Sequence, residues 1–345
     1  MTPAISAAVL GSGPSPGELP AAVRAWRAAA GTGSTHHLVV RAPAAPVHRL
    51  VDELRRAVSR RPDAALAFGP EGQSWNGSAL PLAALRGCAW AAAVPDRAVP
   101  TLALVLPSHR AAEFAEFAED HRVAGTSYGQ AVAAFAREHG VEVLVGVRGL
   151  LAPRRRRGAC PRVAGTLRDE VCPPPGVLPR LLRGRAHVAV RDERDAVWRK
   201  VAWTDHLVRV GRNWPGVAPA AAFVAIADRP SPAPREAVLP LAEVVGYGIA
   251  LGALLEQAPP ERSARGVRGC LVEAVRAGAG PVSPGQWPET WTQELADVLW
   301  RAVGIGARLR SNHGVSDCSL EEIRQSPEVS APGRSGDPHW LWESA

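Results

Sequence analysis

The hydrophobic pattern of the first 150 residues alternates between short apolar runs and longer amphipathic segments. The apolar runs are short enough to be buried strands, and they lie at residues 5–10, 37–40, 64–68, 101–106 and 141–147. Between them, helical spacing of apolar residues predicts helices at residues 18–30, 47–59, 110–119 and 128–138. Because strands alternate with helices, the fold class predicted for residues 1–151 is an open α/β sandwich.

The pattern changes after residue 151. Residues 152–185 are rich in Pro and Arg and show no clear period, which predicts a basic linker between two domains. Beyond it we expect one short strand and then helices, so the prediction for residues 186–325 is a mainly helical domain. The expected elements are a strand at 186–190 and helices at 195–210, 239–257, 266–277 and 290–309. Residues 326–345, rich in Ser, Pro and Gly, are predicted to be a disordered tail.

Composition excludes several classes of protein. Hydrophobic residues make up 46% of the 345 residues, which excludes a collagen, a coiled coil and a wholly disordered chain. The five cysteines include no C-x-x-C pair, so we expect free thiols in a reducing compartment. The first residues lack the charged and apolar regions of a secretory signal, and the most apolar later segment, 239–255, is interrupted by Glu243. A cytoplasmic protein without a membrane span is therefore expected.

The positive charge is concentrated in one part of the chain. The formal net charge is +7, and residues 151–215 hold 15 basic and 6 acidic residues. Arginine almost replaces lysine, since Lys200 is the single lysine, and this usage indicates a GC-rich genome. Basicity alone is then weak support for a nucleic-acid partner, which we do not expect. The basic stretch is either a solvated surface or a site for phosphate, nucleotide or an acidic partner.

Several short motifs follow one another between residues 14 and 151. They are Ala25-Trp26 in a predicted helix, the run Thr35-His36-His37-Leu38-Val39-Val40, Trp75 in a loop, the strand ending at Pro107, and Phe114 and Phe117 in a helix. In this order the motifs resemble the family-2-like glycosyltransferases common in actinobacteria, which have the GT-A type of nucleotide-sugar fold. The resemblance implies a nucleotide-sugar ligand and an N-terminal domain similar to GT-A.

The acidic metal motif of that family is absent here. Where such enzymes carry paired aspartates that hold a divalent metal, this chain has Arg41-Ala42-Pro43-Ala44-Ala45, and the next acidic residue is Asp52. No bound metal or other cofactor is therefore predicted. The favoured hypothesis is a pseudoenzyme, a non-catalytic binding or accessory protein in a specialised bacterial pathway. The alternative is a metal-independent transferase in which Arg41 neutralises the donor diphosphate.

Three further residues are candidates for the chemistry of such a site. His36 and His37 precede the Arg41 position and are candidates for the donor-phosphate site with it, although a structural role in the loop is the alternative. Asp120, at the end of a predicted helix, is the candidate acceptor base, against the alternative of a solvated helix end.

The second half of the chain carries the candidates for a protein or peptide partner. They are three tryptophans, which could equally form core, and a run of four arginines: Trp198, Trp203, Trp214, Arg154, Arg155, Arg156 and Arg157. Gly248 and Gly252 place small residues on one face of an apolar helix. That face fits either a homodimer contact or tight packing within the chain.

Overall fold

The computed structural model describes residues 3–11, 18–29, 32–42, 44–46, 50–69, 74–120, 126–147, 151–153, 167–182, 185–192, 197–202, 241–255, 264–278 and 289–313. Its main element is a mixed sheet of seven strands, in the order β1-β2-β6-β4-β7-β5-β9. These strands are β1 (Ile5–Leu10), β2 (His36–Arg41), β4 (Ala65–Phe68), β5 (Cys88–Ala92), β6 (Ala103–Pro107), β7 (Val143–Gly146) and β9 (Arg168–Cys172). The prediction of an α/β fold is confirmed.

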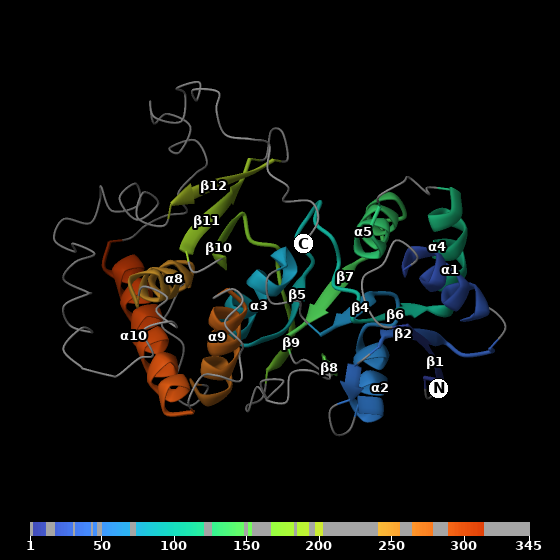
Figure 1. The fold of residues 1–345 in the computed structure, drawn as a ribbon, viewed down its shortest axis with the longest axis horizontal. Helices are drawn as coiled ribbons and strands as arrows, with labels where there is room; N and C mark the ends of the chain where they lie inside the picture. The colour runs from blue at the N-terminus through green and yellow to red at the C-terminus, as the bar shows by residue number, and fades with distance from the viewer. Residues whose placement is uncertain are drawn as a thin grey trace.

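Both faces of this sheet are covered by helices (Figure 1). On one face lies α2 (Leu50–Arg60), whose Leu54 and Val58 pack against Leu66 and Val105 of the strands. The other face is covered by α1 (Glu18–Ala29), α4 (Ser108–Asp120) and α5 (Tyr128–Glu138). Successive side chains along a strand point to opposite faces of the sheet. Because helices cover both faces here, the buried strands are continuously apolar and do not alternate between apolar and polar residues.

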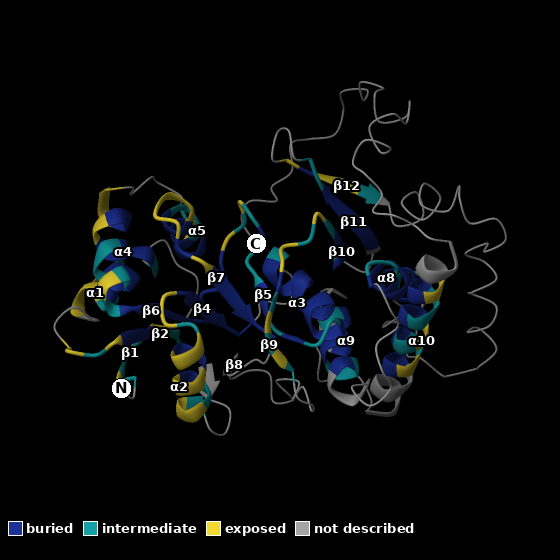
Figure 2. Cartoon of the chain, turned by 180° about the vertical axis from the view of Figure 1, so that it is seen from behind, coloured by how far each residue is buried: buried dark blue, intermediate teal, exposed yellow. Residues whose placement is uncertain are grey.

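Helix α3 (Trp75–Leu85) joins the sheet to the second half of the chain. It begins at the N-cap Ser74, whose Oγ accepts a hydrogen bond from the backbone N–H of Gly77. All its residues from Asn76 to Leu85 are buried, and the helix is accordingly dark in Figure 2, whereas α2 shows an exposed outer face. Helix α3 contacts β5 on one side and, on the other, α9 (Ala264–Gly278) and β10 (Val177–Leu182).

The second half contains a small sheet as well as helices. Strands β10, β11 (Arg185–Arg191) and β12 (Trp198–Ala202) form an antiparallel three-stranded sheet, packed against α8 (Leu241–Ala253). Helix α10 (Glu289–His313) packs along α8 and α9, and a two-stranded pairing of β3 (Ala44–Pro46) with β8 (Leu151–Pro153) completes the described elements. The helix predicted over 195–210 is wrong where the structure describes it, because 198–202 form a strand.

The predicted domain boundary needs two corrections. Residues 168–172, expected within a linker, form the seventh strand of the main sheet by pairing in parallel with β5. Residues 177–182 form β10. One hydrophobic cluster also contains residues from Leu10 to Ala307, so buried side chains from both halves of the chain pack together. The expected tail at 326–345 lies outside the described residues.

The face of α8 that carries Gly248 and Gly252 packs against α10. A Cβ on Gly248 would lie 2.7 Å from the Cβ of Ala302, and one on Gly252 would lie 2.0 Å from the carbonyl oxygen of Val303, both on α10. Because α10 covers this face, a homodimer contact through Gly248 and Gly252 would require α10 to move away. Of the two alternatives, tight packing within the chain is the one observed.

Two further predictions concern thiols and membranes. The three cysteines that the structure describes, Cys88, Cys172 and Cys270, are buried thiols outside any disulfide bond, as expected. None of the described helices is both long enough and apolar enough to cross a bilayer.

Candidate functional site

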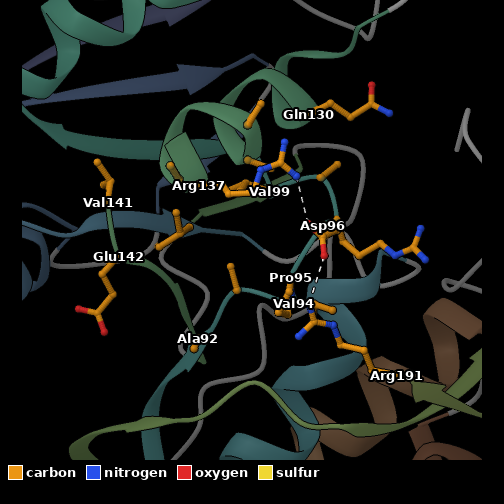
Figure 3. A pocket seen from close by; sticks show the side chains of 17 residues that line it. Ala92, Val94, Pro95, Asp96, Val99, Gln130, Arg137, Val141, Glu142 and Arg191 are labelled. Atoms are coloured by element: carbon orange, nitrogen blue, oxygen red, sulfur yellow. Dashed lines mark hydrogen bonds and ion pairs between the residues drawn. The ribbon is translucent and has the colours of Figure 1, made fainter. Parts of the chain in front are cut away.

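A pocket of about 590 Å³ lies where α5 and the start of β7 meet the loop that follows β5 (Figure 3). Its lining is mostly small and apolar, with Ala and Val side chains from all three elements. The polar side chains in the lining are Asp96, Arg97, Gln130, Arg137, Glu142 and Arg191. Arg191 comes from the end of β11, so the seven-stranded and the three-stranded sheets both contribute to the pocket.

Asp96 is the centre of the charged wall of this pocket. Its Oδ1 accepts a hydrogen bond from Nη1 of Arg137 at 3.1 Å, and its Oδ2 accepts one from Nη2 of Arg191 at 3.2 Å. The dashed lines in Figure 3 show the Asp96 carboxylate between the two guanidinium groups. The arginine side chains are 72% and 30% exposed and that of Asp96 is 35% exposed, so each ion pair contributes at most about 1 kcal/mol to stability.

The loop that carries Asp96 is fixed at both ends. The buried side chain of Asn76 on α3 accepts a hydrogen bond from the Val94 N–H at 2.8 Å and donates one to the Ala98 carbonyl at 2.8 Å. After the loop, the Val99 N–H donates to the Gly129 carbonyl at 3.0 Å. A Cβ on Gly129 would lie 2.4 Å from the Val99 carbonyl oxygen, so this close approach needs glycine. The backbone around Asp96 is therefore held in place before any ligand arrives.

Within this loop Asp96 has a φ of +59°, the left-handed region. Aspartate tolerates that region better than most residues because its short side chain can hydrogen-bond locally. Among the described residues it is the one non-glycine residue with positive φ. Such conformations persist where the surroundings over-determine them, as the Asn76 and Gly129 contacts do here.

Arg97, the next residue, connects the pocket to a partly buried stack of aromatic and cationic side chains. Its guanidinium carbon lies 4.3 Å from the ring centre of Trp75, and that of Arg180, on β10, lies 4.0 Å from the same ring. Arg180 also donates from Nε to Ser78 Oγ at 3.2 Å. Burial, with a smaller effect from the positive charge of Arg97, lowers the pKa of Arg180 to about 10. Arg180 therefore stays charged at neutral pH and adds to the positive potential behind the pocket.

Trp198 belongs to the same stack. Its ring centre is 5.1 Å from that of Trp75, and it is only 8% exposed in a cluster with Leu178 and Ala189. The observed position matches the core alternative for this tryptophan and not a partner-binding surface. The other predicted partner-binding residues, Trp203, Trp214 and Arg154 to Arg157, lie outside the described residues.

The predicted donor-phosphate residues do not come together in one place. Arg41 ends β2, and His36 and His37 begin it, so about 13 to 17 Å of extended strand separates them. Arg41 pairs with Glu18 at the start of α1 at 3.4 Å, with both side chains largely buried. A single diphosphate cannot contact all three residues.

His36 and His37 lie in a hydrogen-bonded cluster at the other end of β2. His36 Nε2 is 2.9 Å from the Pro62 carbonyl oxygen, and His37 Nδ1 is 2.6 Å from Ser6 Oγ, which is also bonded to Ser34. Burial lowers the pKa of both histidines. These contacts fit the structural alternative considered for them.

Asp120 is the exposed last residue of α4. Its neighbour Glu119 pairs with Arg27 on α1, and the lining of the pocket does not include Asp120. The described residues also contain no group of three or more His, Cys, Asp and Glu side chains placed to hold a metal ion.

Sequence comparison adds no relative to this picture. No family model, no curated protein and no solved structure gives a significant match to the chain.

The pocket residues were missed by sequence reasoning. Asp96 is 41 residues from Arg137 and 95 from Arg191, and no motif joins them. The available signal was the turn sequence Pro95-Asp96-Arg97 between two apolar strands.

Proposed function

We propose that this protein binds a small phosphate-bearing ligand, of the nucleoside-diphosphate class, in the pocket beside Asp96, and that it does so without a metal and without transferring a group. The observation that carries the proposal is the convergence of Arg97, Arg137 and Arg191, from three separate elements, on one pocket. A volume of about 590 Å³ lies within the range of small-molecule sites.

Arginine suits this role chemically. The planar guanidinium group is always charged and forms paired hydrogen bonds with phosphate oxygens. In metal-dependent sugar transfer a divalent cation neutralises the diphosphate, and here three guanidinium groups would do so. The resemblance of residues 14–151 to nucleotide-sugar glycosyltransferases supports the same ligand class and makes the protein, on this proposal, a glycosyltransferase-like pseudoenzyme.

The proposal of binding without catalysis rests on the carboxylates near the pocket. A general base needs a carboxylate free to accept a proton from the acceptor hydroxyl. Both oxygens of Asp96 are hydrogen-bonded to guanidinium groups, and in Figure 3 the Glu142 carboxylate extends away from Asp96 and Arg137.

Calorimetry with uridine diphosphate and with pyrophosphate tests the proposal. In buffer containing EDTA, both should bind the parent protein, and Arg191→Ala should weaken binding by roughly tenfold to a hundredfold, as expected for the loss of a charge-assisted hydrogen bond. Arg56→Ala is the matched control, because Arg56 lies exposed on α2, on the far face of the sheet. Absence of heat from the parent protein would overturn the proposal.

Two rival outcomes are distinguishable on the same samples. If Arg41→Ala abolishes binding and Arg191→Ala does not, the ligand lies at the carboxyl end of β2 instead of in this pocket. If incubation of the parent protein with uridine-diphosphate glucose and small alcohol acceptors releases uridine diphosphate, the protein is a metal-independent transferase and the non-catalytic part of the proposal is wrong.

A further inference from the structure

The Asp96 carboxylate occupies the place in the pocket where an incoming anion would be best held. It bridges Arg137 of α5 and Arg191 of β11, two guanidinium groups from separate parts of the fold. In Figure 3 the three side chains form one group on the wall of the pocket. An anionic group of a ligand that bound to both arginines would need the same position.

Arg191 retains a hydrogen-bonding capacity that Asp96 does not use. Its Nε–H is buried and has no acceptor among the described residues, although its Nη2 donates to Asp96. Buried donors in folded proteins are nearly always paired with protein, water or ligand. A phosphate group has three acceptor oxygens and is able to contact Nε and Nη2 of one guanidinium group together.

We infer that Asp96 is a built-in competitor of the ligand: its carboxylate holds Arg137 and Arg191 in the empty pocket, and a phosphate group displaces it on binding. The inference rests on the proposed function, and it specifies the ligand further, as one whose phosphate replaces a carboxylate between two arginines.

Displacement requires movement of one side chain only. The backbone on both sides of Asp96 is held by Asn76 and by Gly129, whereas the Asp96 side chain is one-third exposed and can turn toward solvent. A phosphate monoester carries about 1.5 to 2 negative charges at pH 7, against one on the carboxylate. Because a ligand must displace the Asp96 carboxylate, the pocket favours dianionic ligands. A monoanion such as acetate carries the same charge as that carboxylate and therefore has no electrostatic advantage over it.

Asp96→Asn tests the inference, because asparagine has nearly the same shape, tolerates positive φ and lacks the charge. Pyrophosphate should bind Asp96→Asn at least about fivefold more tightly than the parent protein, since the two ion pairs no longer oppose it. Acetate, at the same ionic strength, should compete with pyrophosphate better in the variant than in the parent. Glu138→Gln is the control for net charge, because it removes one carboxylate from α5 at a position outside the pocket lining; its affinity should change by less than about twofold.

The outcomes separate this inference from the proposed function. If the parent binds pyrophosphate and Asp96→Asn binds it equally or more weakly, Asp96 positions the arginines and does not compete, so the inference fails and the proposed function stands. If neither the parent protein nor Asp96→Asn binds pyrophosphate, both the inference and the proposed function fail. Asp96→Gly, which adopts positive φ without strain, repeats the test should Asp96→Asn not fold, and it should show the same gain in affinity.

Discussion

Gly306 of α10 lies so close to Ile249 of α8 that a Cβ built on Gly306 would be 2.1 Å from the Ile249 carbonyl oxygen. A Cβ on the neighbouring Gly304 of the same helix would, apart from the backbone of its own helix, come no closer than 3.7 Å to another atom, the Nη1 of Arg308. Replacement by alanine is therefore expected to change the free energy of unfolding in opposite directions at the two glycines.

Gly306→Ala should lower the free energy of unfolding by about 1–3 kcal/mol or more, because the two helix backbones must separate. Gly304→Ala should raise it by up to about 1 kcal/mol, because alanine is the better helix former and the site has room. Urea denaturation of both variants checks this. Equal effects of the two substitutions would mean that α8 and α10 are not packed as described.

The two tyrosines of the chain should remain un-ionised well above their usual pH range. Tyr128 and Tyr247 are both only 2% exposed, and burial raises the pKa of each phenol. The unfolded chain loses these protons near pH 10, so stability falls as the pH rises above 10. Absorbance at 295 nm should show tyrosinate only together with loss of circular dichroism. A tyrosinate transition near pH 10 in folded protein would contradict the burial of both rings.

Acidification should destabilise the protein through His36 and His37. Burial lowers the pKa of each ring below 6.5 in the folded state, so the unfolded chain takes up protons first as the pH falls below 6.5. The free energy of unfolding should drop by at most about 1.4 kcal/mol per pH unit for each histidine and be independent of these groups above pH 7.5. His37→Gln should make the pH dependence between 6.5 and 5 shallower. An unchanged dependence in both His36→Gln and His37→Gln would show that neither ring is buried in the neutral form.

Asn76 should matter for the pocket and for stability together. Asn76→Ala leaves the Val94 N–H and the Ala98 carbonyl without their side-chain partner, which should cost about 1–3 kcal/mol of folding free energy. Asn76→Asp keeps the acceptor for the Val94 N–H, but an ionised aspartate has no donor for the Ala98 carbonyl. A protonated carboxyl group can donate its O–H there, so the loss of stability of Asn76→Asp should be smaller at pH values where this carboxyl group is protonated. Thermal denaturation and pyrophosphate titration on the same variants check both effects. A melting temperature of Asn76→Ala within 1 °C of the parent would show that these two hydrogen bonds do not stabilise the fold.

The elements found from the sequence were those with a clear period or a short apolar run. Helix α2 has apolar residues at helical spacing opposite charged ones, and it was expected close to its observed bounds of Leu50–Arg60. Helix α3 was missed because it is buried all round and has no polar face, and because Pro81 within it reads as a break. Residues 198–202 were misread as helix because their strand pairing with β11 depends on residues that no local pattern reveals.

The candidate site was less accessible to sequence reasoning than the fold. Arg41 is a candidate from the sequence because it stands where a metal motif would begin, yet it pairs with Glu18 and is far along the strand from His37. The pocket depends on Asp96, Arg137 and Arg191, which tertiary packing alone brings together. Charge counts along the chain could not single them out, because Asp96 and Arg137 lie outside the basic stretch 151–215 and Arg191 is one of its 15 basic residues.

The pairing of β9 with β5 has a consequence for how the chain folds during synthesis. Trp90 of β5 donates a hydrogen bond to Asp169 of β9, 79 residues later in the sequence. At roughly 5–20 residues per second, the ribosome needs on the order of 4–16 s to make that stretch. Until β9 is made, the side of β5 that pairs with it has no partner strand, and unpaired strand edges promote aggregation. When β9 arrives, its Arg168, Asp169 and Glu170 become the new edge of the sheet, and charged residues on an edge strand discourage pairing with a second chain.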